Sequence, residues 1–192
     1  MTSYRKLIRK PAGRAVTETG AFTRAGYEND QVLALGIAID MPARNRPALR
    51  AVLLQDPQPA DTPPSLADVT LVESFEVPTA DEDRAKQLKD LAETVSARIR
   101  TLKPDIVVIR RADVPPRSSN KEGPRIRLMA TGAVAAAARI LVARTVIRDG
   151  KECGTAYGAN KEKVDADAST LVNERLREAA AAALAGLVAD RG

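Results

Sequence analysis

A chain of 192 residues, of which 44% are hydrophobic and 29% charged, is long enough to bury one substantial core. It has no histidine and one cysteine, Cys153, which excludes an intramolecular disulfide framework, a cysteine cage for zinc and the histidine-dependent catalytic triads. The net charge is +5, and no apolar run approaches the roughly 18 residues that a membrane span needs, so we expect a soluble, cytoplasmic protein.

Charge is distributed unevenly along the chain. The stretch 56–93 is mainly acidic, whereas the stretch 98–151 contains only four acidic residues. Its thirteen basic residues are Arg98, Arg100, Lys103, Arg110, Arg111, Arg117, Lys121, Arg125, Arg127, Arg139, Arg144, Arg148 and Lys151. This segregation favours a polyanion-binding surface, because each Lys or Arg that neutralises a phosphate releases a counterion. The alternative is a solvated basic surface without a partner.

The first thirty residues differ in character from the rest. Five basic residues and no acidic ones precede Ala15, and core-forming positions are few. We therefore predict a basic, partly disordered arm over 1–30, followed by a single domain over 31–192.

Three strands are predicted at the start of the domain. The apolar run 31–40 has the length of a strand, and the stretches 48–55 and 70–77 have strand-forming composition. The proline-rich segment 56–64 cannot continue a sheet and separates the second strand from the third. Three strands in succession predict an antiparallel meander.

A long amphipathic helix and a buried strand are predicted next. Thr79 and Glu82 are spaced as a capping box, and apolar residues recur behind them every three or four positions up to Leu102. The β-branched run 105–109 follows Pro104 and is typical of a strand covered on both faces. A polar loop, an alanine-rich helix, a strand, a glycine-containing loop and a final helix are then predicted over 113–124, 125–140, 141–147, 150–161 and 161–188.

The order βββ-α-β-α-β-α predicts an α/β fold of the ribonuclease H-like type. Within it, four segments occur in a characteristic order: Leu35-Gly-Ile37, Leu102-Lys-Pro-Asp-Ile-Val-Val-Ile109, Met129 to Ala137 and Asn160 to Val164. Through these segments the sequence from about Val32 to Leu187 resembles the RuvC-like Holliday-junction resolvases. The resemblance implies a mixed sheet with helices on both faces. In this family about four carboxylates hold two magnesium ions, which stabilise the attacking and leaving oxygens at a phosphate.

At the positions that the resemblance assigns to those carboxylates, the chain has other residues. Ala38 follows Leu-Gly-Ile where an aspartate is expected, and Asp40, one strand repeat further on, points to the same face and could replace it. The second position is Arg110. In the stretch that corresponds to the last pair, 178–183, Glu178 is the one acid. The resemblance thus implies a degenerate site with no cofactor; an active chain would use Asp40 and Glu178 as catalytic residues, with Asp40 binding Mg²⁺.

For several of these residues the sequence leaves other interpretations open. Asp40 could instead cap the turn that follows it, and Arg110 and Arg111 could form an exposed strand end rather than contact phosphate. The alanines of 179–183 favour tight helix packing. Three further acids are expected to face solvent in the first turns of the last helix: Glu162, Asp165 and Asp167.

The favoured hypothesis is a catalytically degenerate RuvC-like module that binds structured or branched DNA or RNA, alone or as a subunit of a larger nucleoprotein complex. The residues predicted to contact phosphate are Arg110, Arg111, Arg117, Lys121, Arg125 and Arg127. The alternative is a divergent magnesium-dependent endonuclease built around Asp40, Glu178 and either Asp105 or Asp113. A third hypothesis is a protein-interaction subunit, either a homodimer or a chain bound to another protein through its apolar helix faces.

Overall fold

The computed structural model describes residues 31–43, 46–57, 65–113 and 121–189. The predicted basic arm over 1–30 and Arg117, one of the predicted phosphate contacts, lie outside the described residues.

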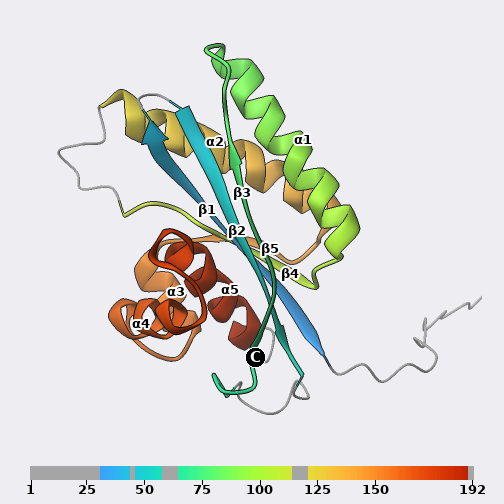
Figure 1. Ribbon diagram of the computed structural model, residues 1–192, viewed down its shortest axis with the longest axis vertical. Coiled ribbons are helices and arrows are strands. Elements are labelled where there is room, and N and C mark those ends of the chain that lie inside the picture. Colours follow the sequence, from blue (N-terminus) through green and yellow to red (C-terminus); the bar gives the residue numbers. More distant parts are fainter. Residues whose placement is uncertain (1–30, 44–45, 58–64, 114–120, 190–192) are drawn as a thin grey trace, which may run out of the picture.

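A five-stranded mixed sheet forms the centre of the molecule (Figure 1). Its strands are β1 (Val32–Ala43), β2 (Arg46–Asp56), β3 (Thr70–Pro78), β4 (Ile106–Arg110) and β5 (Thr145–Arg148), in the spatial order β3-β2-β1-β4-β5. Strands β1, β2 and β3 pair antiparallel, which confirms the predicted meander. Strand β4 runs parallel to both β1 and β5.

Helices cover both faces of the sheet, as predicted (Figure 1). They are α1 (Arg84–Leu102), α2 (Glu122–Leu141), α3 (Gly150–Ala156), α4 (Lys161–Leu171), the 3-10 turn η2 (Glu174–Leu176) and α5 (Arg177–Ala189). Helices α1 and α2 pack on one face, and α3, α4 and α5 pack on the other. No helix in the described parts of the chain combines the length and the apolar character that a membrane span requires.

Strand β1 contributes to the cores on both faces because its side chains alternate. Leu35, Ile37 and Ile39 belong to the cluster beneath α1 and α2. Ala34 and Ala38 belong to the other cluster, which α5 covers. The continuous apolar character of β1 thus follows from its position in the middle of the sheet.

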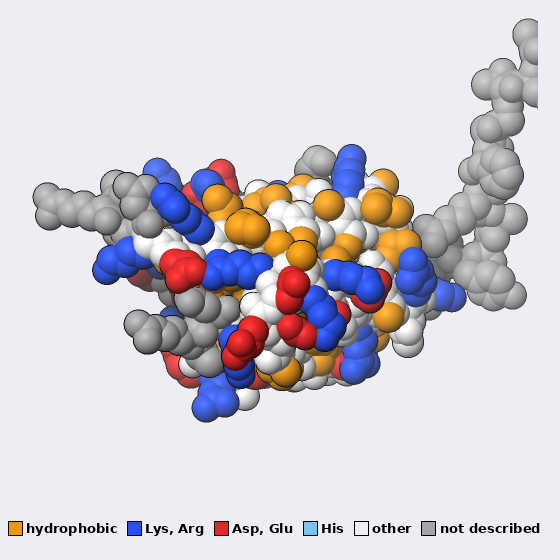
Figure 2. Space-filling model, turned by 90° about the horizontal axis from the view of Figure 1, so that it is seen from above, with side chains coloured by type: hydrophobic (Ala, Val, Ile, Leu, Met, Phe, Trp, Pro, Cys, Tyr) orange, Lys and Arg blue, Asp and Glu red, His pale blue; other side chains and the backbone are white. Residues whose placement is uncertain are grey.

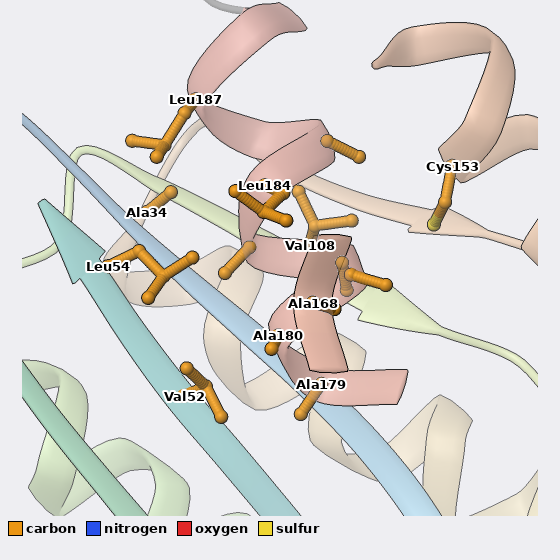
Figure 3. Packing of buried hydrophobic residues seen from close by; sticks show 14 of the residues in the cluster. Ala34, Val52, Leu54, Val108, Cys153, Ala168, Ala179, Ala180, Leu184 and Leu187 are labelled. Carbon is orange, nitrogen blue, oxygen red and sulfur yellow. The ribbon is translucent and has the colours of Figure 1, made fainter. Parts of the chain in front are cut away.

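Helix α5 lies unusually close to β1 at Gly36. A Cβ atom on this glycine would be 1.9 Å from the backbone oxygen of Ala179 and 2.4 Å from the backbone nitrogen of Ala183. The alanine run 179–183 is fully buried against the sheet (Figure 3). The predicted role of these alanines in tight helix packing is confirmed, since larger side chains on either partner would hold the helix and the strand apart.

Two predictions about the C-terminal third are wrong. The glycine-containing segment, predicted as a loop, forms helix α3, whose N-cap Asp149 makes a capping box with Glu152. The final helix is not continuous: Val172 is extended and Asn173 caps a new 3-10 turn, so the chain reverses between α4 and α5.

Two helix starts also differ from the predictions. Helix α1 is capped by Asp83, whereas the hydroxyl of Thr79 donates to the backbone oxygen of Pro47. Helix α2 begins at Glu122 because Pro124 lies in its first turn, where a missing backbone N–H costs no helical hydrogen bond.

Candidate functional site

Ala38 and Arg110 are register partners on the parallel strands β1 and β4. These are two of the positions at which the resemblance implies metal-binding carboxylates. A methyl group supplies no ligand, and a guanidinium carries the same sign of charge as a metal ion. The residues present at these two positions therefore do not fit a magnesium pair.

The Arg110 side chain is buried, with 2% of its surface exposed, and it forms an ion pair with Asp165 of α4. Nη1 donates to one carboxylate oxygen, and Nη2 donates to the other at 3.1 Å. Burial alone would lower the pKa of Arg110, but the hydrogen bond and the charge of Asp165 raise it above its usual value. The guanidinium thus stays charged inside the protein.

This geometry corrects three expectations. Arg110 is not an exposed strand end, and its guanidinium, occupied by Asp165, is not presented at the surface to a phosphate. Asp165 and Asp167 do not face solvent; Asp167 is buried beside Tyr157 and Lys163. The sequence did contain one signal for this pair: a charged residue at the end of a buried strand needs a buried partner of opposite charge. Sequence spacing alone could not identify Asp165 as that partner.

A second ion pair, between Lys161 and Asp113, lies near the Arg110 guanidinium. Lys161 Nζ lies 2.9 Å from Oδ2 of Asp113, and Oδ1 of the same carboxylate accepts a 3.2 Å hydrogen bond from the backbone N–H of Gly150. Burial alone would raise the pKa of Asp113, but the hydrogen bonds from Lys161 and the Gly150 backbone, together with the positive charges of Lys161 and Arg110, lower it below its usual value. A Cβ atom on Gly150 would lie 2.8 Å from Nη2 of Arg110. The neighbourhood of Arg110 is thus closely packed.

Beside Ala38 the surface is hollowed over about 510 Å³. We call this feature the arginine hollow, after the four arginines that line it together with four acids and two small residues: Arg50, Arg127, Arg175, Arg177, Asp40, Glu76, Glu174, Glu178, Ala38 and Pro42. Asp40 shares the hollow with Ala38, which confirms that the two lie on the same face of β1. Glu178, from the start of α5, lines it as well.

Arginines already neutralise the two acids that were candidates for catalysis. Arg50 Nη1 lies 2.9 Å from an oxygen of Asp40, and Arg127 Nη2 lies 3.0 Å from an oxygen of Glu178. A metal ion would have to displace both guanidinium groups. In the parts of the chain that the structure describes, no three or more Asp, Glu or Cys side chains are grouped so that they could hold a metal.

The other two acids of the nuclease hypothesis lie elsewhere. Asp105 immediately precedes β4, and Arg110 is at the other end of this strand. The Asp105 carboxylate accepts a 2.9 Å hydrogen bond from the backbone N–H of Leu33. Asp113 is bound to Lys161. The structure therefore does not bring either of them to Asp40 and Glu178.

The predicted phosphate contacts are only partly gathered in one place. Arg127 lines the arginine hollow, and Lys121 and Arg125 are exposed at the start of the same helix. Arg111 is half exposed and lies 2.8 Å from Asp149. The sequence did not indicate three other arginines of the hollow, because they lie outside the basic stretch and converge only through the fold. Arg50 comes from β2, Arg175 from η2, and Arg177 is the first residue of α5.

Charge on the surface is more mixed than the linear sequence indicated. Figure 2 shows Lys and Arg side chains alternating with Asp and Glu on one face, beside an area of hydrophobic side chains. Two acids of the stretch 56–93 also pair with arginines: Glu73 lies beside Arg98, and Glu76 lies beside Arg50. On this face the basic residues therefore form local clusters rather than one uniformly positive area.

No family model matches the sequence, and no curated protein sequence matches it. Solved structures do. The chain superposes on RuvC of Thermus thermophilus with a TM-score of 0.57 and 16% identity, over 80% of this chain and 92% of that one. It also superposes on T. thermophilus RuvC in complex with a Holliday junction substrate, with a TM-score of 0.55 and 18% identity, over 84% and 96% of the two chains. The protein therefore has a RuvC-like, ribonuclease H-like fold.

Proposed function

We propose that the protein is a catalytically degenerate RuvC-like module that binds structured or branched nucleic acid without cutting it. The observation that carries this proposal is the pair of residues Ala38 and Arg110 at two positions for metal-binding carboxylates, with Arg110 fixed there by Asp165.

Electrostatics opposes a metal at this place. A guanidinium about 4 Å from a divalent cation is repelled by about 8 kcal/mol at an effective dielectric constant of about 20, which is an upper bound. Asp40 and Glu178 could offset part of this repulsion only by giving up their pairs with Arg50 and Arg127. The arginine hollow therefore does not offer the set of free carboxylates that magnesium-dependent hydrolysis would need to bind the metal ions.

The arginine hollow is the best candidate for a phosphate contact that needs no metal. The Nε atoms of Arg127 and Arg177 are buried there without a hydrogen-bond acceptor, and that of Arg50 lies 3.6 Å from a carboxylate oxygen of Glu76. Buried donors without acceptors are unfavourable in the free protein. A phosphate whose oxygens accept hydrogen bonds from these side chains would remove that penalty, which lowers the free-energy cost of reorienting them. Arginine also suits phosphate because its planar fork binds two oxygens at once.

Exposed basic residues extend this surface. Lys121 and Arg125 begin the helix that carries Arg127, and Arg111 is half exposed at the end of β4. The five basic residues before Ala15 would add affinity. One of the neighbouring structures contains a Holliday junction, which supports a branched nucleic acid as the partner. Binding through phosphates would depend on shape and little on sequence.

A salt titration with matched variants tests this proposal. Binding of a labelled four-way junction should weaken about a thousandfold between about 50 and 200 mM salt if roughly six phosphates are contacted. Changing Lys121, Arg125 and Arg127 together to Gln should reduce the salt slope by about three units. The control removes the same charge from helix α1 through Gln at Lys89, Arg98 and Arg100. Equal losses in both triple variants, or a flat salt profile, would refute the proposed surface.

The second candidate function is a divergent metal-dependent endonuclease. One observation favours it: Asp40 and Glu178 line the same hollow. Metal-dependent cleavage that is lost in an Asp40→Asn variant would establish it.

A further inference from the structure

In the arginine hollow the acids lie further out than the arginines with which they pair. The Asp40 side chain is 40% exposed, whereas its partner Arg50 is 14% exposed. The exposed fractions of Glu178 and Arg127 are 42% and 22%. The other two ion pairs described among the lining residues have the same order. A phosphate that approaches the hollow therefore meets carboxylates before it meets guanidinium groups.

This order is not general among the ion pairs that the structure describes. In the pair of Arg111 with Asp149 and in the pair of Lys163 with Asp167, the basic side chain is the more exposed partner. The outward position of the acids is thus a property of the hollow rather than of the protein's ion pairs as a whole.

Arg50 is engaged on several sides by groups of the protein itself. Its Nη1 lies 2.9 Å from Oδ2 of Asp40 and donates to the backbone oxygen of Arg175 at 3.0 Å, and its Nε lies 3.6 Å from Oε1 of Glu76. A phosphate can bind this guanidinium in two-point fashion only after Asp40 has moved away. Since Asp40 is covalently part of β1, its charge stays close by and repels the phosphate.

The hollow as a whole carries no formal net charge, because its four arginines are balanced by its four acids. It therefore exerts little long-range attraction on a polyanion. Each phosphate that enters must take the place of a carboxylate, so one ion pair is broken for each that forms. The gain in binding free energy per phosphate is then smaller than an unpaired arginine would give.

We propose that Asp40 and Glu178 are built-in competitors of phosphate. In the free protein they occupy Arg50 and Arg127, and a nucleic acid binds in the hollow only by displacing them. The displaced carboxylates remain beside the site and compete again as soon as a phosphate moves away, so they limit the affinity and speed the release of the nucleic acid. This role rests on the nucleic-acid binding proposed above and needs no metal ion.

The test compares the full wild-type chain with the double variant Asp40→Asn, Glu178→Gln in binding to a labelled four-way junction. Both replacements keep the shape of the side chain, and both side chains are partly exposed, so the variant should fold with nearly the wild-type melting temperature. At about 50 mM salt it should bind the junction about tenfold or more tightly, mainly through slower dissociation. Its salt slope should be steeper by about one to two units, because bound phosphates no longer leave a freed carboxylate that retains a cation.

The matched control is the double variant Asp90→Asn, Glu93→Gln on helix α1. It removes the same two negative charges from exposed positions on the opposite face of the sheet from α5 (Figure 1). It therefore measures the general effect of a more positive protein, and its affinity should rise by less than about threefold.

A hollow variant that binds no more tightly than the α1 control would overturn the proposal. Weaker binding would also overturn it, because it would mean that the two acids position the arginines for phosphate. A lower melting temperature without tighter binding would assign the ion pairs to stability alone. If neither the wild type nor either variant binds the junction at low salt, the proposed function fails as well; binding by the wild type with no gain in the hollow variant refutes only the competitor role.

Discussion

Arg110 and Asp165 form a two-point ion pair inside the protein, between the end of β4 and the middle of α4. In a metal site, carboxylates bind a dissociable metal cation. Here the Asp165 carboxylate instead binds the guanidinium of Arg110, which is covalently part of the chain. A buried cationic side chain therefore stands at a position where the resemblance implies a metal-binding carboxylate, and its pair with Asp165 links β4 to α4.

Asp165→Asn should lower the free energy of unfolding by about 3–5 kcal/mol, because it leaves a buried guanidinium without its counter-charge. Urea unfolding at neutral pH measures the change. The control is Glu93→Gln on α1, whose pair with Lys89 is about two-thirds exposed on both sides and should contribute less than about 1 kcal/mol. Similar losses in the two variants would contradict the structural role of the Arg110 pair.

Gly36→Ala should destabilise the protein by about 1–3 kcal/mol or more, because the added methyl group meets the backbone of α5 rather than a movable side chain. Thermal unfolding measures this effect. Gly123→Ala, where the methyl group meets nothing, should leave the melting temperature unchanged or raise it. If the protein tolerates Gly36→Ala as well as Gly123→Ala, α5 does not pack on β1 as described.

Cys153 should not react with thiol reagents in the folded protein. It is fully buried, and desolvation raises the pKa of its thiol to about 11, so almost no thiolate is present at pH 8. Labelling with a chromogenic disulfide reagent should be slow in buffer and complete in denaturant. Rapid labelling without denaturant would show that α3 opens readily.

The charge of Asp149 should stabilise the folded protein at neutral pH but not at strongly acidic pH. The backbone N–H of Glu152, and then the Arg111 guanidinium, hold the pKa of this carboxyl below its usual value of about 3.9. The unfolded state therefore takes up the proton first as pH falls, and the stabilisation present above about pH 4 is lost as pH decreases through the lower, folded-state value. Asp149→Asn keeps a capping side chain but removes the charge. The wild type should be more stable than this variant at pH 6, and the difference should shrink toward pH 2; a constant difference would contradict the assignment.

Apolar patterning was sufficient to predict the sheet, because burial on both faces produces continuous β-branched runs such as Ile106 to Ile109. The break at Asn173 was not predicted, because the apolar periodicity continues across it. The local signal that marks the break is Asn173 itself, which caps the 3-10 turn η2. Helix α3 was predictable, since Asp149 and Glu152 have capping-box spacing, but its two glycines favoured a loop. They are required for another reason: Cβ atoms on Gly150 and Gly154 would meet Lys161 and the backbone of Asn160.

The candidate site was predictable only in part. The shared face of Ala38 and Asp40 follows from the alternation of side chains along a strand. The resemblance assigned Ala38 and Arg110 to one site, and the structure makes them register partners. The pairing of Arg110 with Asp165 does not follow from the sequence, because 55 residues separate them and several other acids were available. Long-range ion pairs have no local sequence signal comparable to helical periodicity.

The most direct test of a module that binds without cutting is one incubation of the wild-type chain with a labelled four-way junction in magnesium and in manganese, resolved on native and denaturing gels. We expect a shifted complex at low salt and an intact junction strand in both metals. A shortened strand that disappears in Asp40→Asn, or a junction that does not shift at low salt, would contradict the proposal.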